Sequence, residues 1–219
     1  ATCENLEHLF TAGVDNNPGD TAMLRKVLTL LGETGCKDSE LYYKAATSLY
    51  NSDPSASSAA QLAEMNLARK KYNEAEKYYT EAIDLETDSK IKSGLLTKLA
   101  TLELTSDSKQ AARDFARAAF SLDPTNGNAL FIIAEAYAGS RIGETFENQT
   151  VYWVVVDYLV RARNTDPTLK EQVDERIGIY SRLFPTKEEA FFRSLVEEGA
   201  SYLVGGWINE STTVRFRKE

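Results

Sequence analysis

Residues that could serve acid–base or metal chemistry are few and scattered along the chain. His8 is the only histidine, and Glu4 and Glu7 are the only residues near it at ligand spacing. A zinc or iron centre needs several His, Cys or carboxylate ligands that converge on one point. We therefore interpret His8 as a surface residue and expect neither a metal nor a cofactor.

Carboxylates are plentiful, but their pattern does not indicate catalysis. Glu188-Glu189 and Glu197-Glu198 are adjacent pairs of the kind found on solvated helix faces. The sequence has no glycine-rich phosphate loop, no nucleophile elbow and no H-E-x-x-H helix. No catalytic residue can be nominated, and we expect that the protein is not an enzyme.

The composition excludes two classes of partner. The 25 basic and 33 acidic residues give a net charge of -8, and no basic run is longer than Arg69-Lys70-Lys71. A nucleic-acid binder needs a basic stripe that displaces counterions. The longest apolar stretches, such as residues 151–156, are far shorter than the roughly 20 residues of a spanning helix. We expect no nucleic-acid partner and no membrane insertion.

One spacing pattern recurs four times along the chain. Counted from the first residue of each copy, a second residue follows at four positions, a third at seven positions, and a residue that ends the helix at twelve positions. Offsets of four and seven lie on one helical face, where small residues let a neighbouring helix approach closely. The four copies are Ala75, Tyr79, Ala82, Thr87; Ala112, Ala116, Ala119, Pro124; Val155, Leu159, Ala162, Pro167; and Tyr42, Ala46, Leu49, Pro54.

A second amphipathic stretch accompanies each copy, so the units are helix-turn-helix pairs. Residues 73–85 and 119–126 are the segments in which the sequence most resembles the tetratricopeptide repeat family, and the resemblance covers about residues 20–184. It implies an all-α superhelix of antiparallel helix pairs, and we expect about two-thirds of the chain to be helical. An ordinary helical bundle is the alternative. The copies begin 33, 37 and 43 residues apart, so the array is irregular.

The resemblance also implies a binding surface. In tetratricopeptide arrays the first helix of each pair lines a concave groove, where family members bind peptides or helices. Carried onto this sequence, the groove residues are Ala60, Glu64, Leu67, Thr97, Lys98, Thr101, Phe131, Glu135, Asp174 and Arg182.

One subgroup of the family clamps the terminal carboxylate of heat-shock chaperones with Lys, Asn and Arg side chains in this groove. That clamp is missing here. Glu64, Glu135 and Asp174 are expected to repel a C-terminal acid. The residues at the matching positions are Ala60, Glu64, Lys98, Asn128 and Ile132.

An insertion of about nine residues, 140–148, separates the two helices of the fourth pair. Its Gly and Asn content and its lack of period predict a loop. Loops on rigid scaffolds often carry sites, although most surface insertions are merely tolerated. An enzyme or small-molecule binder that uses this loop with Tyr137 and Trp153 is therefore a less favoured hypothesis.

The period changes near the C-terminus. We expect one more helix over about 187–198, then a β-hairpin with strands over 202–208 and 212–217 and a turn at 209–211. A solenoid needs a cap over its last exposed face, so we interpret the hairpin as a cap and not as a ligand site. The expected domains are helical repeats over 1–185, with the insertion at about 140–149, and a C-terminal cap over 186–219.

The two cysteines, Cys3 and Cys36, are expected to form a disulfide. A predicted helix near 2–13, a turn at 15–19 and a second helix over about 20–34 bring the start of the first helix toward the end of the second. Two buried free thiols in a cytoplasmic protein are the alternative. A disulfide favours an oxidising compartment such as the periplasm or cell envelope.

Two functional hypotheses follow from the repeat. The first is a protein-interaction scaffold that binds an extended or helical partner segment in the concave groove. The second is the structural C-terminal half of a longer exported bacterial protein whose missing N-terminal part fills the groove. The chain begins without a Met and is similar to the last third of long bacterial tetratricopeptide proteins of unassigned function.

Overall fold

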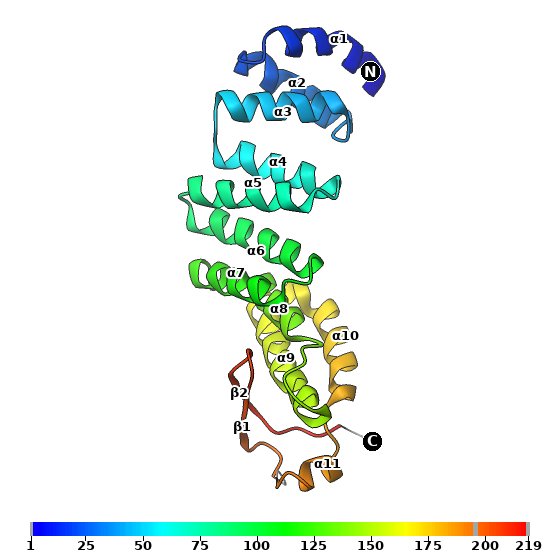
Figure 1. Ribbon diagram of the computed structural model, residues 1–219, viewed down its shortest axis with the longest axis vertical. Helices are drawn as coiled ribbons and strands as arrows, with labels where there is room; N and C mark the ends of the chain where they lie inside the picture. Colours follow the sequence, from blue (N-terminus) through cyan, green and yellow to red (C-terminus); the bar gives the residue numbers. More distant parts are fainter. Residues whose placement is uncertain (1, 195–196, 218–219) are drawn as a thin grey trace. The chain divides into compact units, whose positions relative to one another are not determined.

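The computed structural model describes residues 2–194 and 197–217 and is built mainly of helices (Figure 1). Helices account for 71% of the chain, which confirms the expected two-thirds, and one small antiparallel sheet accompanies them. The chain forms two compact units, residues 1–91 and 92–219, with the boundary inside helix α6 (Ser89–Thr105).

Capping side chains set the starts of the first four helices in the first unit, whereas the fifth begins without one. Thr2, Asp20, Ser39 and Ser55 each accept a hydrogen bond from a backbone N–H of the first turn, at 3.0–3.4 Å. Such caps stabilise a helix start by about 1 kcal/mol each. The helices are α1 (Cys3–Asn16), α2 (Thr21–Glu33), α3 (Glu40–Ser52), α4 (Ala56–Ala68) and α5 (Tyr72–Leu85).

The core of the first unit uses the repeat positions as the sequence predicts. On α5, Ala75 and Ala82 are 0% exposed and Tyr79 is 1% exposed. The equivalent α3 residues Ala46 and Leu49 are 2% and 4% exposed. The side chains that the pattern assigns to the shared face are therefore the ones that pack between helices.

A disulfide joins the start of α1 to the segment that follows α2. The Cα atoms of Cys3 and Cys36 lie 5.5 Å apart. The Cys36 N–H donates to the Leu31 carbonyl at 2.8 Å, which turns the chain back over the end of α2. The described residues contain no free cysteine.

The second unit continues the helix pairs and ends in a hairpin. Its core gathers around residues of α8 and α9 such as Ile133 and Leu159, which are at most 1% exposed. After α6, its elements are α7 (Lys109–Leu122), α8 (Gly127–Tyr137), α9 (Thr145–Thr165), η1 (Pro167–Leu169), α10 (Lys170–Tyr180), η2 (Ser181–Leu183), α11 (Lys187–Phe191), β1 (Ser201–Val204) and β2 (Glu210–Thr213).

A buried polar link fixes the junction of α6, α7 and α8. Ser93 on α6 donates through its hydroxyl to the Ala119 carbonyl on α7 at 2.8 Å. Asn126, which caps α8, donates to the hydroxyls of Ser93 and Thr97 at 2.8 and 2.9 Å. These bonds satisfy polar groups that would be costly to bury alone, and so they favour one arrangement of the three helices.

The unequal repeat lengths have structural causes. Helix α6 has 17 residues where α4 has 13, which accounts for the step of 37 in place of 33. The step of 43 comes from the connection 138–144 and from a long α9 of 21 residues. The prediction of a loop over 140–148 is wrong for residues 145–148, because α9 already begins at Thr145.

The C-terminal prediction is correct in kind but wrong in its bounds. Helix α11 ends at Phe191 and a turn follows, so the chain is not helical to residue 198, and residues 195–196 lie outside the described part. Strand β1 ends at Val204 and pairs antiparallel with β2, with Val204 opposite Glu210. Residues 205–208 therefore belong to the turn, and Glu210 and Ser211 to a strand.

Gly127 gives a direct test of the α8–α9 contact. A Cβ on this residue would lie 2.5 Å from the Cβ of Asp166, the residue after α9, and 2.9 Å from the Ala162 carbonyl oxygen in its last turn. Gly127→Ala should lower the free energy of unfolding by about 1–3 kcal/mol. The control is Gly94→Ala on α6, where a Cβ meets nothing within 4 Å. It should stabilise by about 0.5–1 kcal/mol. Denaturant titration measures both, and equal effects would contradict the packing.

The Cys3–Cys36 bridge closes a loop with a sequence separation of 33 residues. In the chain-entropy model such a loop stabilises the fold by about 3–4 kcal/mol. The Cys3→Ser/Cys36→Ser variant should lose about this much, and a reductant should lower the stability of the parent protein but not of the variant. Thiol titration of the unfolded, unreduced protein should find no reactive thiol. Two reactive thiols would overturn the pairing.

Candidate functional site

The expected groove residues of the first unit lie on one side of α4. Glu64 is exposed, and Ala60 and Leu67 are half-buried. The opposite side of α4 packs into the core through Leu62, which is 0% exposed. Burial, and secondarily the charge of Glu64, raises the pKa of the neighbouring Tyr79 to about 12. We call this less buried side of the first helices, in each unit separately, the first-helix face.

In the second unit the face begins on α6 with Thr97, Lys98 and Thr101. Lys98 and Thr101 are exposed and Thr97 is half-buried. The Thr97 hydroxyl donates to the Ser93 carbonyl at 2.8 Å, and the Thr101 hydroxyl donates to the Thr97 carbonyl at 2.9 Å. Both threonine hydroxyls thus donate to their own helix, and the Thr97 oxygen also accepts from Asn126. Of the two, it is the Thr101 oxygen, with its methyl group, that can accept from a partner.

Helix α8 contributes Phe131 and Glu135, and α10 lies against them. Phe131 is half-buried against the core. The Glu135 carboxylate lies 3.4 Å from the Arg176 Nε atom and accepts a hydrogen bond from the Tyr180 hydroxyl at 3.2 Å. Burial first, and then the charge of Glu135, raises the pKa of Tyr180 to about 12. Glu135 therefore joins α8 to α10.

Asp174 also forms ion pairs with basic side chains. Its carboxylate lies 2.8 Å from the Lys170 Nζ atom and accepts a hydrogen bond from Arg163. The bond from Lys170 and then that from Arg163 hold the pKa of Asp174 below its usual value. Because Arg176 and Lys170 neutralise them, Glu135 and Asp174 repel an acidic ligand less than the sequence alone predicts.

Arg182, the last expected groove residue, follows α10 and is exposed. It lines a pocket of about 580 Å³ together with residues of the 138–144 connection and the start of α9. Two further arginines of this pocket, Arg141 and Arg217, were not identified from the sequence. Arg141 lies in the predicted insertion, but no local pattern links Arg217 to it.

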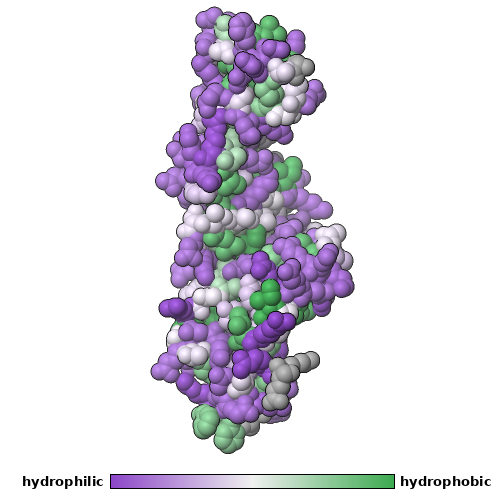
Figure 2. All heavy atoms as spheres, turned by 90° about the vertical axis from the view of Figure 1, so that its right-hand side faces the viewer, coloured by the Kyte–Doolittle hydropathy of each residue, from purple (hydrophilic) through white to green (hydrophobic). Residues whose placement is uncertain are grey.

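The surface around α10 is mainly polar. On the side of the molecule shown in Figure 2, hydrophilic atoms predominate and hydrophobic atoms form small separate patches. Exposed apolar residues of this unit include Ile179 and Leu183, which are 42% and 41% exposed. A surface of this kind suits mixed polar and apolar contacts better than one large hydrophobic contact.

The hairpin packs against the second helices, α7 and α9. Arg113 of α7 donates to the Trp207 carbonyl at 2.8 Å, and its guanidinium lies 5.0 Å from the centre of the Trp207 ring. Asp157 of α9 accepts hydrogen bonds from Thr212 and Arg215. The hairpin thus covers the side formed by the second helices and makes these contacts away from the first-helix face.

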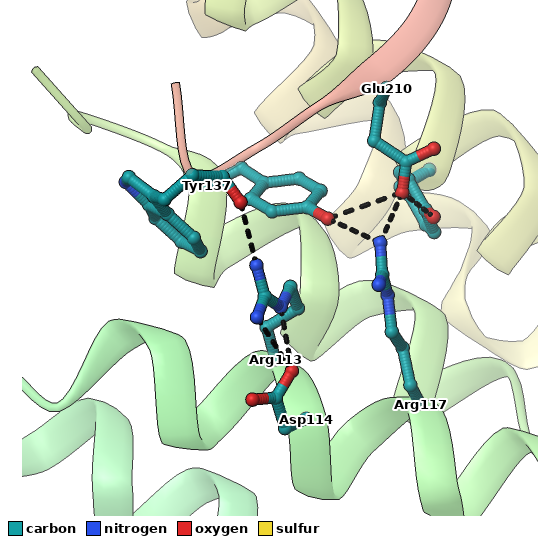
Figure 3. Close-up of polar contacts among 7 residues, drawn as sticks. Arg113, Asp114, Arg117, Tyr137 and Glu210 are labelled. Atoms are coloured by element: carbon teal, nitrogen blue, oxygen red, sulfur yellow. Dashed lines mark hydrogen bonds and ion pairs between the residues drawn. The ribbon is translucent and has the colours of Figure 1, made fainter. Parts of the chain in front are cut away.

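Glu210 of β2 is the centre of this contact (Figure 3). One of its oxygens accepts hydrogen bonds from Tyr137 at 3.2 Å and Tyr158 at 2.7 Å, and it also pairs with Arg117. Burial raises the pKa of Tyr137, so this phenol stays neutral and keeps donating at ordinary pH. Three helices are in this way bound to one carboxylate.

Tyr137 and Trp153 do not serve the 138–144 connection as a site. Both are 0% exposed. The Trp153 Nε1–H donates to the Arg215 carbonyl at 2.8 Å, and Tyr137 is held by Glu210. The hypothesis of a ligand site built on these two aromatic residues is not supported, because both face the hairpin.

The described residues contain neither a cluster of metal ligands nor a membrane-spanning helix. Over 2–194 and 197–217, no group of three or more His, Cys, Asp or Glu side chains is arranged to hold a metal ion. Within the same residues, no helix combines the length and apolar character that crossing a membrane requires.

The comparisons with known proteins give a fold and no close relative. No family model matches the chain, and no curated protein matches it. MamA from Desulfovibrio magneticus RS-1 is a similar solved structure, with 12% identity, a TM-score of 0.58, and 81% of this chain and 88% of that chain covered. A MamA RS-1 double mutant reaches 0.61 at 14% identity, over 81% of this chain and 93% of that one.

A third similar structure is YrrB, described as a TPR protein with an unusual peptide-binding site. Its identity is 14%, its TM-score is 0.54, and 86% of this chain and 85% of that chain are covered. At these identities the likeness concerns the arrangement of the helices. The chain therefore has the tetratricopeptide-type fold that its internal repeat predicts.

Proposed function

We propose that the chain is a protein-interaction scaffold, and not an enzyme, that binds an extended or helical segment of a partner protein on its first-helix face. The observation that carries the proposal is that one side of the second unit binds the hairpin, whereas the other side is exposed. The hairpin is bonded to α7 and α9 through Glu210 and Asp157. Thr101 on α6 and Arg182, which follows α10, remain exposed.

The structural neighbours support this function by analogy. YrrB is described as having a peptide-binding site, and this chain shares its fold. A fold does not fix a function, so the partner must be argued from the face itself. Thr101, Phe131 and Arg182 offer methyl, aromatic and guanidinium contacts, which suit a peptide with both apolar and polar side chains.

The two cysteines support a proposal about the compartment. A Cys3–Cys36 disulfide persists in an oxidising environment and is rare in the cytosol. We therefore propose the periplasm or cell envelope as the compartment of the scaffold. The alternative, in which the chain is the structural C-terminal half of a larger exported protein, uses the same face for another part of that protein.

A charge placed on the first-helix face should block the partner. Thr101→Arg adds a long cation to an exposed position of α6, and Ala118→Arg makes the same charge change at an exposed position of α7, a second helix. In a pull-down from native lysate, quantified by mass spectrometry, Thr101→Arg should reduce capture of the partner by about tenfold. Ala118→Arg should leave it unchanged.

Melting temperatures of both variants provide the control for folding, since both positions are exposed. If Thr101→Arg keeps the parent's partners, or if both variants lose them equally, the first-helix face is not the binding surface.

A further inference from the structure

The pocket at Arg182 is formed by segments that are far apart in the sequence. It lies among the connection 138–144, the start of α9, the segment that follows α10, and the chain after β2, and its volume is about 580 Å³. This volume is within the range of about 300–1,000 Å³ that is usual for ligand pockets. No residue of the first unit contributes to it.

Three arginines line the pocket, one each from three of these segments. Arg141, Arg182 and Arg217 are all exposed. Within residues 2–194 and 197–217, none of their guanidinium groups has a hydrogen-bond or ion-pair partner. The charge of Arg217 makes a small contribution to lowering the pKa of Glu189, after the larger effect of the Thr186 backbone. Arg141 and Arg182 are thus the two cations most available to a ligand.

The pocket is positive in a protein of net charge -8. Its one acidic lining residue, Glu144, is paired with Arg193 at 3.1 Å. Guanidinium groups bind carboxylates through paired hydrogen bonds, and an acidic ligand is attracted where the local charge opposes its own. The local chemistry therefore selects anions, which the rest of the acidic surface disfavours.

One side of the pocket is apolar. The Tyr152 ring stacks on Tyr180 with 5.5 Å between ring centres and 29° between planes. Leu183 is 41% exposed beside it. A ligand that fits these walls carries apolar groups as well as negative charge. A single inorganic anion would use only the arginines.

The loop that carries Arg141 is already ordered. The Asn148 side chain accepts hydrogen bonds from the N–H groups of Ile142 and Gly143 at 2.8 and 3.3 Å, and it donates to the Gly143 carbonyl at 3.0 Å. A loop that is fixed before binding loses little conformational entropy when a ligand arrives. This explains how exposed arginines could still give useful affinity.

The pocket continues the first-helix face of the second unit. Tyr180 contacts Glu135 on one side and stacks on Tyr152, a lining residue, on the other. We propose that this pocket binds an acidic, partly apolar peptide segment of the partner, with Asp or Glu carboxylates at Arg141 and Arg182 and an apolar side chain at Tyr152 and Leu183. The proposal rests on the scaffold function and names the chemistry of its partner.

The test uses the full chain and a defined probe, a fluorescein-labelled eight-residue peptide of alternating Glu and Leu. Fluorescence anisotropy should show binding that weakens with salt. Arg141→Ala/Arg182→Ala should weaken it by about tenfold or more. The control Lys26→Ala/Lys90→Ala removes the same charge at two exposed lysines of the first unit and should leave binding unchanged. A peptide with Gln in place of Glu should bind about tenfold more weakly.

Three results would overturn the proposal. They are no binding of the Glu peptide, an equal loss in both double variants, and binding of inorganic phosphate at the pocket without binding of the peptide. The last result would assign the pocket to a small anion. Partner capture is measured separately with Thr101→Arg, so failure of the peptide assay would reject the acidic-segment pocket and leave the scaffold function to its own experiment.

Discussion

The close approach of paired helices through small side chains is the constraint on which the rest of the structure depends. Ala75, Ala82, Ala112, Ala116 and Ala119 are all 0% exposed. A methyl group at these positions lets two helix backbones come near, and a larger side chain would force them apart. Each pair therefore buries one side of both helices, and the opposite side of the first helix is left to carry exposed side chains of mixed character.

The hairpin extends this division in the second unit. Through Glu210 it bonds to Arg117 and Tyr158 on the second helices α7 and α9 and to Tyr137 at the end of α8. A carboxylate with three donors is satisfied, whereas loss of one partner leaves a charge that is costly to bury. The C-terminal segment thereby holds a fixed course along α9, and this course brings Arg217 to the pocket that Arg141 and Arg182 also line.

The sequence predicts the features that repeat with the period of a helix. It misses those that form only when segments far apart in the sequence come together. Alanine at offsets of four and seven was enough to assign the helix pairs and their buried positions, because helical geometry repeats. It was not enough to show that residues 145–148 begin α9, since Asn148 reads as a loop residue until its side chain is seen to bind Ile142 and Gly143. Glu135 looked like a free acid of the groove because its partner Arg176 lies on another helix. The arginines of the pocket come together only through the fold.

Substitution at Ala82 tests the central claim most directly, because this residue is 0% exposed on the shared face of α5. Ala82→Phe should lower the free energy of unfolding by about 1–3 kcal/mol, since the ring overpacks the contact between α4 and α5. Asp84→Phe places the same ring at an exposed position of the same helix and should change the stability by less than about 0.5 kcal/mol. Denaturant unfolding of the two variants that gave equal stabilities would contradict the packing of helix pairs through small residues.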